Sequence, residues 1–298
     1  MTTHVVDPNR VPDAPLVPPG DSGGLHNVFR QRYLLRLLVR KELRARYQGS
    51  VLGLLWSYVQ PAVRFCAYYF VIGYVFGLTR GMENFAVHVF AGMVMVHYFT
   101  ETFSAGTRSI VQNRGLIQKL SLPREMFPVA SMLVSAYHTF PQMLILLVGV
   151  LVAGWAPTPY DFAAGLLGFT IIAVFGMALA LVFSAANVFF RDFSNIVQTF
   201  TIFVTWSVPM IYPYDRIQDL LGGTIWEQVY LANPIANGVI LFQQLFWVPT
   251  VSKDSEYPAV MPDDLMTRGL IVLAVCLVLL FVAQRIFTRL EGKFAERL

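Results

Sequence analysis

Residues 161–188 read DFAAGLLGFTIIAVFGMALALVFSAANV, and their single charged residue, Asp161, stands at the start. A hydrocarbon core about 30 Å thick is crossed by about 20 apolar residues in a helix, so this stretch predicts a membrane span. Five further stretches have the same character, at about 52–78, 85–106, 128–154, 196–213 and 268–288. The sequence therefore predicts an all-α membrane protein with six transmembrane helices.

The composition agrees with a membrane domain. Hydrophobic residues make up 56% of the 298 residues and charged residues 13%, whereas a soluble domain carries about 25% charged residues. Cys66 and Cys276 both lie in apolar runs, which excludes a disulfide framework and a cysteine-based zinc site. We expect no metal site, and the modest net charge of +4 gives no reason to expect nucleic acid as a partner.

Three segments lie outside the predicted six-helix domain, residues 49–290. Residues 1–25 are rich in Pro, Asp and Gly and are expected to be disordered. Residues 26–48 predict an amphipathic helix on the cytoplasmic membrane surface, and residues 291–298 a cytoplasmic tail. On the helix, one side carries Leu34, Leu35, Leu38 and Val39, and another carries Arg36, Arg40 and Arg44.

Residues 214–267 form the long segment before the last span. Within it, Asn233-Pro234 interrupts an apolar run, and proline disfavours helical geometry at the residue before it. We therefore expect two short helices that form a re-entrant or interfacial pair on the outer side.

The charges orient the chain. If both termini are cytoplasmic, 17 of the 22 Lys and Arg residues lie on the cytoplasmic side, while the outer segments are acidic. Cytoplasmic loops carry such an excess of basic residues. The prediction is a multi-pass protein of the cytoplasmic (inner) membrane with both termini inside.

Motifs for nucleotide or hydrolytic chemistry are missing from the sequence. It holds no G-x-x-x-x-G-K-[ST] loop, H-E-x-x-H or G-x-S-x-G. His88, His97 and His138 have no His, Asp or Cys partner at i+3 or i+4, which favours hydrogen bonds between helices over metal binding or proton relay. The energy source must therefore be a partner or an ion gradient, and we expect no cofactor in this chain.

Four segments resemble the membrane permeases of bacterial ATP-binding-cassette polysaccharide exporters, which move O-antigen, teichoic acid and related lipid-linked glycans. They are RYQGSVLGLLWSYVQP (46–61), NRGLIQKLSLPREMFPVA (113–130), NVFFRDFSNIVQ (187–198) and NPIANGVILFQQ (233–244). The four segments occur in the order found in the family, and the resemblance extends over most of residues 30–298. The first motif and the proline-rich start look most like actinobacterial galactan exporters. The resemblance implies a permease rather than an enzyme, with ATP and Mg²⁺ bound by two copies of a separate ATPase subunit.

The loop between the second and third spans is basic. The resemblance implies that it couples the permease to the ATPase, with Leu116, Ile117 and Leu120 filling an apolar groove and Arg114, Lys119 and Arg124 orienting the docking. Pro123 closes the loop. The alternative is a loop that only fixes topology through the positive-inside rule.

Arg64 lies near the middle of the first span, where a charge is costly. It either pairs with Glu101 of the second span or faces the substrate pathway and binds an anionic pyrophosphate lipid head. Asp192, after Arg191, is either an ordinary helix cap, with Ser194 as the other candidate, or part of a gate.

Aromatic residues recur in two spans. Tyr58, Phe65, Tyr69 and Phe76 share one side of the first span. The resemblance implies that they line a sugar pathway, whereas plain helix packing explains the spacing equally well. A weaker set in the fifth span is Phe200, Phe203 and Trp206, followed by Pro209 and Pro213, which break that helix at a possible outer gate.

Six helices leave little lumen, so a pathway on the axis of a two-fold homodimer is the simplest arrangement. Membrane lipids and a lipid-linked polysaccharide complete the expected partners. Two rival functions stay open at this point. A membrane-embedded transferase acting on lipid-linked sugars requires clustered acids or a His at a membrane surface. A gradient-driven transporter predicts internal inverted repeats and paired broken helices.

Overall fold

The described part of the chain is helical. The computed structural model describes residues 24–119, 122–252 and 254–297 and forms no strand within them. The helices are α1 (Gly24–Arg30), α2 (Arg32–Tyr47), η1 (Gly53–Leu55), α3 (Trp56–Tyr68), η2 (Tyr69–Val75), η3 (Leu78–Arg80), α4 (Phe85–Gln112), α5 (Arg114–Ile117), α6 (Met126–Val152), α7 (Pro159–Phe189), α8 (Phe193–Ser207), α9 (Tyr214–Leu221), α10 (Ile225–Leu231), α11 (Pro234–Phe246), η4 (Val248–Thr250), α12 (Leu265–Glu291) and α13 (Phe294–Arg297).

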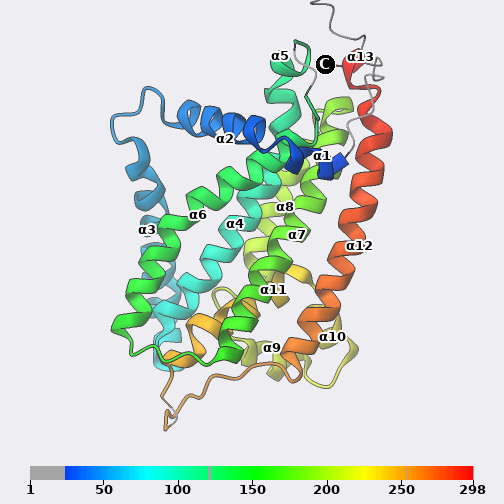
Figure 1. The fold of residues 1–298 in the computed structure, drawn as a ribbon. Coiled ribbons are helices and arrows are strands. Elements are labelled where there is room, and N and C mark those ends of the chain that lie inside the picture. Colours follow the sequence, from blue (N-terminus) through cyan, green and yellow to red (C-terminus); the bar gives the residue numbers. More distant parts are fainter. Residues whose placement is uncertain (1–23, 120–121, 253, 298) are drawn as a thin grey trace, which may run out of the picture.

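Long helices α4, α6, α7 and α12 run beside one another and form the body of the molecule (Figure 1). Helix α2 lies across one end of this bundle, where α1, α5 and α13 are also found. Helices α9 and α10 and the segment that leads into α12 lie at the other end. The first and last described helices are thus at the same end.

Within the described residues, three helices are both long and apolar enough to cross a membrane: α6, α7 and α12. Helices α3 and α8, with 13 and 15 residues, are shorter than a full span, and α4 is long but carries more polar side chains. Most of α4 is buried among α6, α7, α8 and α11, so protein rather than lipid surrounds its polar groups.

The predicted first span, 52–78, is not one regular α-helix. It consists of a 3₁₀ turn (η1), the α-helix α3 and a π-helical stretch (η2). Near the end of η2 the Thr79 hydroxyl donates to the Gly73 carbonyl at 3.1 Å, and the Phe85 ring leaves no room for a side chain at Gly73. Such π-helical stretches occur often at functional sites.

Helices α7 and α11 approach closely at glycines. A Cβ atom added to Gly168 would lie 2.6 Å from the Gly238 carbonyl oxygen, and one added to Gly165 would lie 2.3 Å from Leu245. Small residues allow two backbones to meet in this way inside a membrane. Buried on nearly all sides, α11 sits against α7, α4 and α12.

The break in the outer segment falls where the sequence predicts it. Helix α10 ends at Leu231 and α11 begins at Pro234, with the Asn233 side chain accepting the Ile235 N–H at 3.0 Å. Because α11 packs within the bundle, it re-enters the protein rather than lying on its surface.

The predicted amphipathic helix, 26–48, is divided into α1 and α2, and α1 already begins at Gly24. Leu35 and Leu38 are buried against α6 and neighbouring helices, whereas Leu34 is exposed. The apolar side is therefore narrower than predicted. Arg36, Arg40 and Arg44 are exposed. Residues 1–23 of the predicted disordered tail lie outside the described residues.

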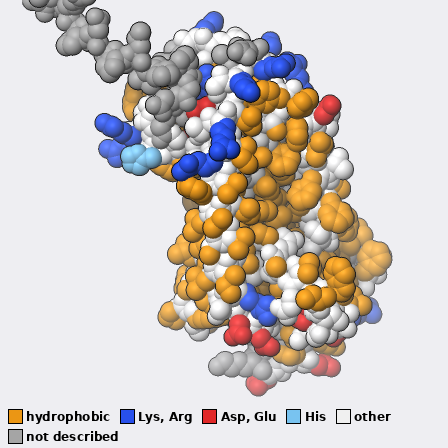
Figure 2. Space-filling model, turned by 90° about the vertical axis from the view of Figure 1, so that its right-hand side faces the viewer, with side chains coloured by type: hydrophobic (Ala, Val, Ile, Leu, Met, Phe, Trp, Pro, Cys, Tyr) orange, Lys and Arg blue, Asp and Glu red, His pale blue; other side chains and the backbone are white. Residues whose placement is uncertain are grey.

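Charges divide between the two ends of the molecule. Figure 2 shows a broad apolar band with basic side chains gathered at one end and mostly acidic ones at the other. The basic end carries α2, α5 and α13, and the acidic end carries α9 and α10. This is the arrangement that the positive-inside rule associates with a cytoplasmic and an outer face.

Candidate functional site

A polar groove of about 220 Å³ opens between α3 and α8, with α4 as its floor. We call it the α3–α8 groove. Arg64 of α3, His97 and Thr100 of α4, and Thr201 and Thr205 of α8 contribute its polar side chains. Polar and charged residues at membrane depth usually face a watery cavity or another protein surface, so the groove is the first candidate for a substrate pathway.

The predicted pairing of Arg64 with Glu101 is wrong. Glu101 forms its ion pair with Arg46, which lies at the end of α2, while Arg64 is exposed and forms no ion pair within the described residues. The reason is geometric: α2 crosses the end of the bundle, which brings Arg46 to the C-terminal half of α4. Arg64 is left facing the α3–α8 groove.

The aromatic residues of the first span divide into two groups. Phe65 packs edge-on against Phe90 of α4, with ring centroids 5.1 Å apart, and Tyr69 packs against Phe85 at 6.3 Å. Tyr58 is half-buried and Phe76 exposed. Helix packing therefore accounts for Phe65 and Tyr69, which is the alternative to a sugar pathway that their spacing left open.

Aromatic residues of α8 divide in the same way. Phe200 meets Phe103 of α4 with centroids 6.2 Å apart. Phe203 and Trp206 are 70% and 58% exposed and contact none of the other described aromatic rings closely. They remain available to a substrate or to a second copy of the chain.

Helix α8 ends where the prolines predict. Its last residue is Ser207, and Val208 is extended before Pro209. Residues 208–211 are nevertheless buried, so this irregular backbone needs partners. The Gln243 side chain of α11 donates to the Pro209 carbonyl at 2.8 Å, and His88 Nε2 lies 3.3 Å from the Tyr212 carbonyl oxygen.

Asp192 stands at the N-cap position of α8 but makes no side-chain capping bond. Ser194 does not cap the helix either, because its hydroxyl donates to the Arg191 carbonyl at 2.9 Å. The predicted side-chain cap is therefore wrong. Instead the backbone carbonyl of Asp192 accepts the N–H groups of Asn195 and Ile196.

In the loop predicted to couple to an ATPase, the short helix α5 lies at the basic end of the bundle (Figure 1). Arg114 and Lys119 are exposed. Leu116 and Ile117 are half-buried and already pack against the protein's own core. They can therefore fill an external groove only in part. Leu120 lies outside the described residues.

Pro123 and Arg124 face inward, unlike the rest of that loop. Pro123 is buried, and the Arg124 guanidinium donates to the Glu291 carbonyl of α12. It also lies over the Phe294 ring, 5.7 Å from the centroid. Arg124 therefore fixes the loop to the C-terminal helices, and the prediction that it orients docking is not supported by its position.

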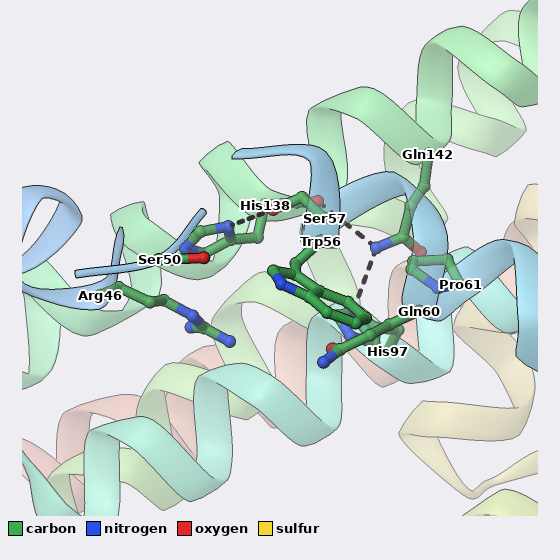
Figure 3. A pocket seen from close by; sticks show the side chains of 9 residues that line it. All are labelled: Arg46, Ser50, Trp56, Ser57, Gln60, Pro61, His97, His138 and Gln142. Atoms are coloured by element: carbon green, nitrogen blue, oxygen red, sulfur yellow. Dashed lines mark hydrogen bonds between the residues drawn. The ribbon is translucent and has the colours of Figure 1, made fainter. Parts of the chain in front are cut away.

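The three histidines make hydrogen bonds between helices, as the sequence predicts. His97 Nδ1 lies 3.3 Å from Gln142 Nε2 of α6, and His138 Nδ1 lies 3.2 Å from the Ser57 hydroxyl of α3 (Figure 3). His88 lies near the irregular segment after α8. Within the described residues, no group of three His, Cys, Asp or Glu side chains is placed to hold a metal ion.

Two residues in this region have long-range partners that no local pattern could indicate. Gln243 is part of the NPIANGVILFQQ motif, but its partner Pro209 lies 34 positions away. Arg46 is separated from Glu101 by 55 positions. The only sequence signal is that Gln243 and Arg46 each lie within a stretch that resembles known permeases.

Acidification is expected to weaken the contact between α9 and α10. The Tyr214 hydroxyl donates to Glu227 Oε1 at 2.5 Å and the Gly223 N–H donates to Oε2 at 3.0 Å, and both bonds lower the pKa of Glu227 below its ordinary 4.5. The bonds therefore stabilise the fold fully above about pH 4.5 and lose their effect as the pH falls through the lowered pKa.

Thermal unfolding of wild type and Tyr214→Phe checks this expectation. The variant lacks the principal donor, so its melting temperature is expected to be lower than that of wild type at pH 7. The gap should close as the pH falls below 4.5. A gap of the same size at every pH would contradict the assignment.

Comparison with known proteins identifies the class. The ABC-2 type transporter family matches residues 33–247, so the chain belongs to that family. The O-antigen export system permease protein RfbA of Myxococcus xanthus is 28% identical over 275 residues, which are 91% of this chain and 98% of the relative. A Klebsiella pneumoniae protein of the same name is 26% identical over 267 residues, 88% of this chain and 94% of the relative.

A more distant relative is the capsule polysaccharide export inner-membrane protein CtrC of Neisseria meningitidis serogroup B. It is 23% identical over 233 residues, which are 73% of this chain and 85% of the relative. The chain is thus the permease of an ABC transporter, a membrane subunit without a catalytic domain that works with an ATPase subunit. It is a multi-pass protein of the inner membrane.

Proposed function

We propose that the chain exports a lipid-linked polysaccharide, of the O-antigen, teichoic acid or galactan type, across the cytoplasmic membrane. The names of the relatives support this substrate class, since they are permeases for O-antigen and for capsule polysaccharide. Among the three glycans, the first motif and the proline-rich start favour galactan. The observation that carries the proposal within the molecule is the charged, hydroxyl-lined α3–α8 groove.

The groove also supports a homodimer. Arg64 would face lipid in a monomer, which is costly for a charge. A second copy related by a two-fold axis would cover both grooves and place them on one central pathway. Phe203 and Trp206 would then border that pathway, where aromatic rings suit the apolar faces of sugars.

The topology proposed for this pathway has six spans. Helices α3 with η2, α4, α6, α7, α8 and α12 would cross the membrane, although α3 and α8 are short. An even number of crossings agrees with α1 and α13 lying at one end of the bundle (Figure 1). The basic side chains at that end (Figure 2) favour a cytoplasmic position for both termini.

Two ATPase subunits would bind the cytoplasmic end and hold ATP and Mg²⁺. The exposed Arg114, at the start of α5, and the exposed Lys119, just after this helix, are available to contact them. ATP-driven closure of the two subunits would move α5 and the helices joined to it, α4 and α6. Motion of α3 against α8 would then open the pathway.

Arg64→Gln is the variant that tests the groove. If Arg64 binds the phosphate of the lipid carrier, the loss of a charged hydrogen bond of about 1.5–3 kcal/mol lowers export about tenfold or more. Export is measured as surface glycan against glycan retained in the cytoplasm, in a deletion strain carrying the variant. Because Arg64 is exposed and has no ion-pair partner among the described residues, the protein level is expected to stay unchanged.

The matched control is Arg80→Gln, an exposed arginine beyond the far end of the same span. It should export as wild type does. Equal export by Arg64→Gln and Arg80→Gln at equal protein levels would remove the groove from the pathway. A deletion strain that still displays its glycan and accumulates none inside the cell would overturn the proposed function itself.

A further inference from the structure

The motif at residues 46–61 folds into a hook that encloses a polar cavity. Helix α2 ends at Tyr47, the chain reverses through Gly49 and Gly53, both with positive φ, and α3 begins at Trp56. Of the nine side chains lining a cavity of about 200 Å³, six belong to the hook: Arg46, Ser50, Trp56, Ser57, Gln60 and Pro61. His97 of α4 and His138 and Gln142 of α6 complete the hook cavity (Figure 3).

The chemistry of the hook cavity suits a sugar. The Gln142 amide nitrogen lies 3.3 Å from His97 Nδ1 and 3.3 Å from the His138 carbonyl oxygen. Its Oε1 is buried and has no hydrogen-bond partner in the described part of the chain. A buried acceptor without a donor is costly, and a sugar hydroxyl would supply the donor. Trp56, 43% exposed, adds an aromatic surface against which a sugar ring can pack.

A larger cavity of about 450 Å³ adjoins the hook cavity at Arg46, which lines both. This α2 cavity lies between α2, α4 and α6, and its charged side chains are Lys41, Arg46, Arg108, Glu42 and Glu101. Three cations thus face two carboxylates. Burial raises the pKa of the Glu42 carboxyl above its ordinary value.

On its other side the hook cavity adjoins the α3–α8 groove at His97, which lines both. The α2 cavity, the hook cavity and the groove therefore form a row that leads from the cytoplasmic end of the bundle to Arg64. The α2 cavity, at the start of the row, holds the cationic side chains. The hook cavity in the middle holds Trp56 and the amide side chains of Gln60 and Gln142, and the α3–α8 groove at the end is the proposed pathway.

We propose that the α2 cavity and the hook cavity together form a loading site for the diphosphate-sugar end of a lipid carrier. The diphosphate would lie among Lys41, Arg46 and Arg108, and the first sugar against Trp56 and Gln142. Charge-assisted hydrogen bonds from lysine and arginine to phosphate are about twice as strong as hydrogen bonds between neutral groups. The site rests on the proposed function and adds the place where the substrate is held before it reaches the groove.

Binding of undecaprenyl diphosphate–N-acetylglucosamine to the full-length chain, in nanodiscs of neutral phospholipid, tests the site. Arg46→Gln is expected to weaken binding about tenfold or more, because a charged hydrogen bond to phosphate is lost. Arg32→Gln is the matched control: Arg32 is exposed on the same helix, lines none of the three cavities, and should leave binding within about twofold of wild type.

Glu101→Gln separates binding from structure. It breaks the same ion pair as Arg46→Gln but leaves the arginine in place, so it should bind at least as tightly as wild type. Equal losses in Arg46→Gln and Glu101→Gln would mean that the ion pair only supports the fold, and would overturn the site. Gln142→Leu should weaken binding of the sugar-bearing carrier and leave binding of undecaprenyl diphosphate without a sugar unchanged.

Competition experiments show which kind of phosphate compound the site binds. Inorganic pyrophosphate in excess should displace the carrier, because the cations bind phosphate with or without a lipid. Phosphatidylglycerol that competes as well as the carrier would overturn the proposal in favour of a general anionic-lipid surface. If wild type exports glycan in cells but does not bind the carrier, or binds it no more tightly than Arg46→Gln does, the loading site is wrong and the proposed function stands. If wild type exports no glycan, the proposed function itself is wrong.

Discussion

Gly168→Val is expected to destabilise the bundle by about 3 kcal/mol, near the upper end of what overpacking costs in a core. Even the Cβ atom would lie 2.6 Å from the Gly238 carbonyl oxygen and 2.9 Å from the Leu241 Cβ. Since the nearest obstacle is backbone, no rotamer change can relieve the clash, and α7 and α11 would have to move apart. The measurement is thermal unfolding of the purified protein in detergent, followed by size-exclusion chromatography.

Gly149→Val is the matched control for this variant. Gly149 also lies inside a long helix, α6, but it is exposed and an added Cβ would meet nothing within 4 Å. The two variants share the change in helix propensity, so their difference isolates the packing at α7 and α11. If both unfolded at the same temperature, the close approach of Gly168 and Gly238 would be wrong.

Gln243→Leu is expected to release the irregular segment that follows α8. The Pro209 carbonyl is buried and receives its hydrogen bond from the Gln243 amide, which also lies 3.3 Å from His88 Nε2. Leucine fills similar space and cannot donate, so a buried acceptor loses its partner at a cost of about 1–3 kcal/mol. This segment carries the prolines predicted to lie at an outer gate.

Hydrogen–deuterium exchange of peptides covering residues 208–214 measures that release. Exchange there should become faster in Gln243→Leu, while Gln218→Leu, an exposed glutamine of α9, should leave it unchanged. Unchanged exchange in both variants would show that Gln243 does not hold the segment.

Local sequence pattern predicted those parts of the fold that depend on local physics. The uninterrupted apolar stretches became α6, α7 and α12, and each lies within a few residues of its predicted bounds. Pro209 and Pro234 set the end of α8 and the start of α11, because proline restricts the residue before it. These features need no knowledge of distant neighbours.

Other features depend on contacts between distant residues and could not be predicted. The π-helical stretch η2 lies in a run that is apolar throughout, and its geometry depends on Phe85 and Thr79 beyond its end. The choice of Arg46 rather than Arg64 as partner of Glu101 depends on the path of α2 across the bundle. Arg124 likewise turns inward because Glu291 and Phe294 lie beside it.

For the candidate site, the sequence predicted residue types better than roles. Arg64 was singled out by its charge within an apolar helix, and it does line a polar groove. Phe65 and Tyr69 were singled out by spacing, but they pack on α4. A stripe of aromatic residues looks the same in sequence whether it faces a neighbouring helix or an open path, so only the packing could separate these roles.

Reconstitution of the full-length chain with its ATPase subunit in sealed liposomes tests most directly whether this protein is a permease driven from outside itself. Lipid-linked glycan should appear on the far side of the membrane only when both subunits and ATP are present, and the chain alone should hydrolyse no nucleotide. ATP hydrolysis by the isolated chain, or glycan transfer that needs no ATPase, would contradict the account.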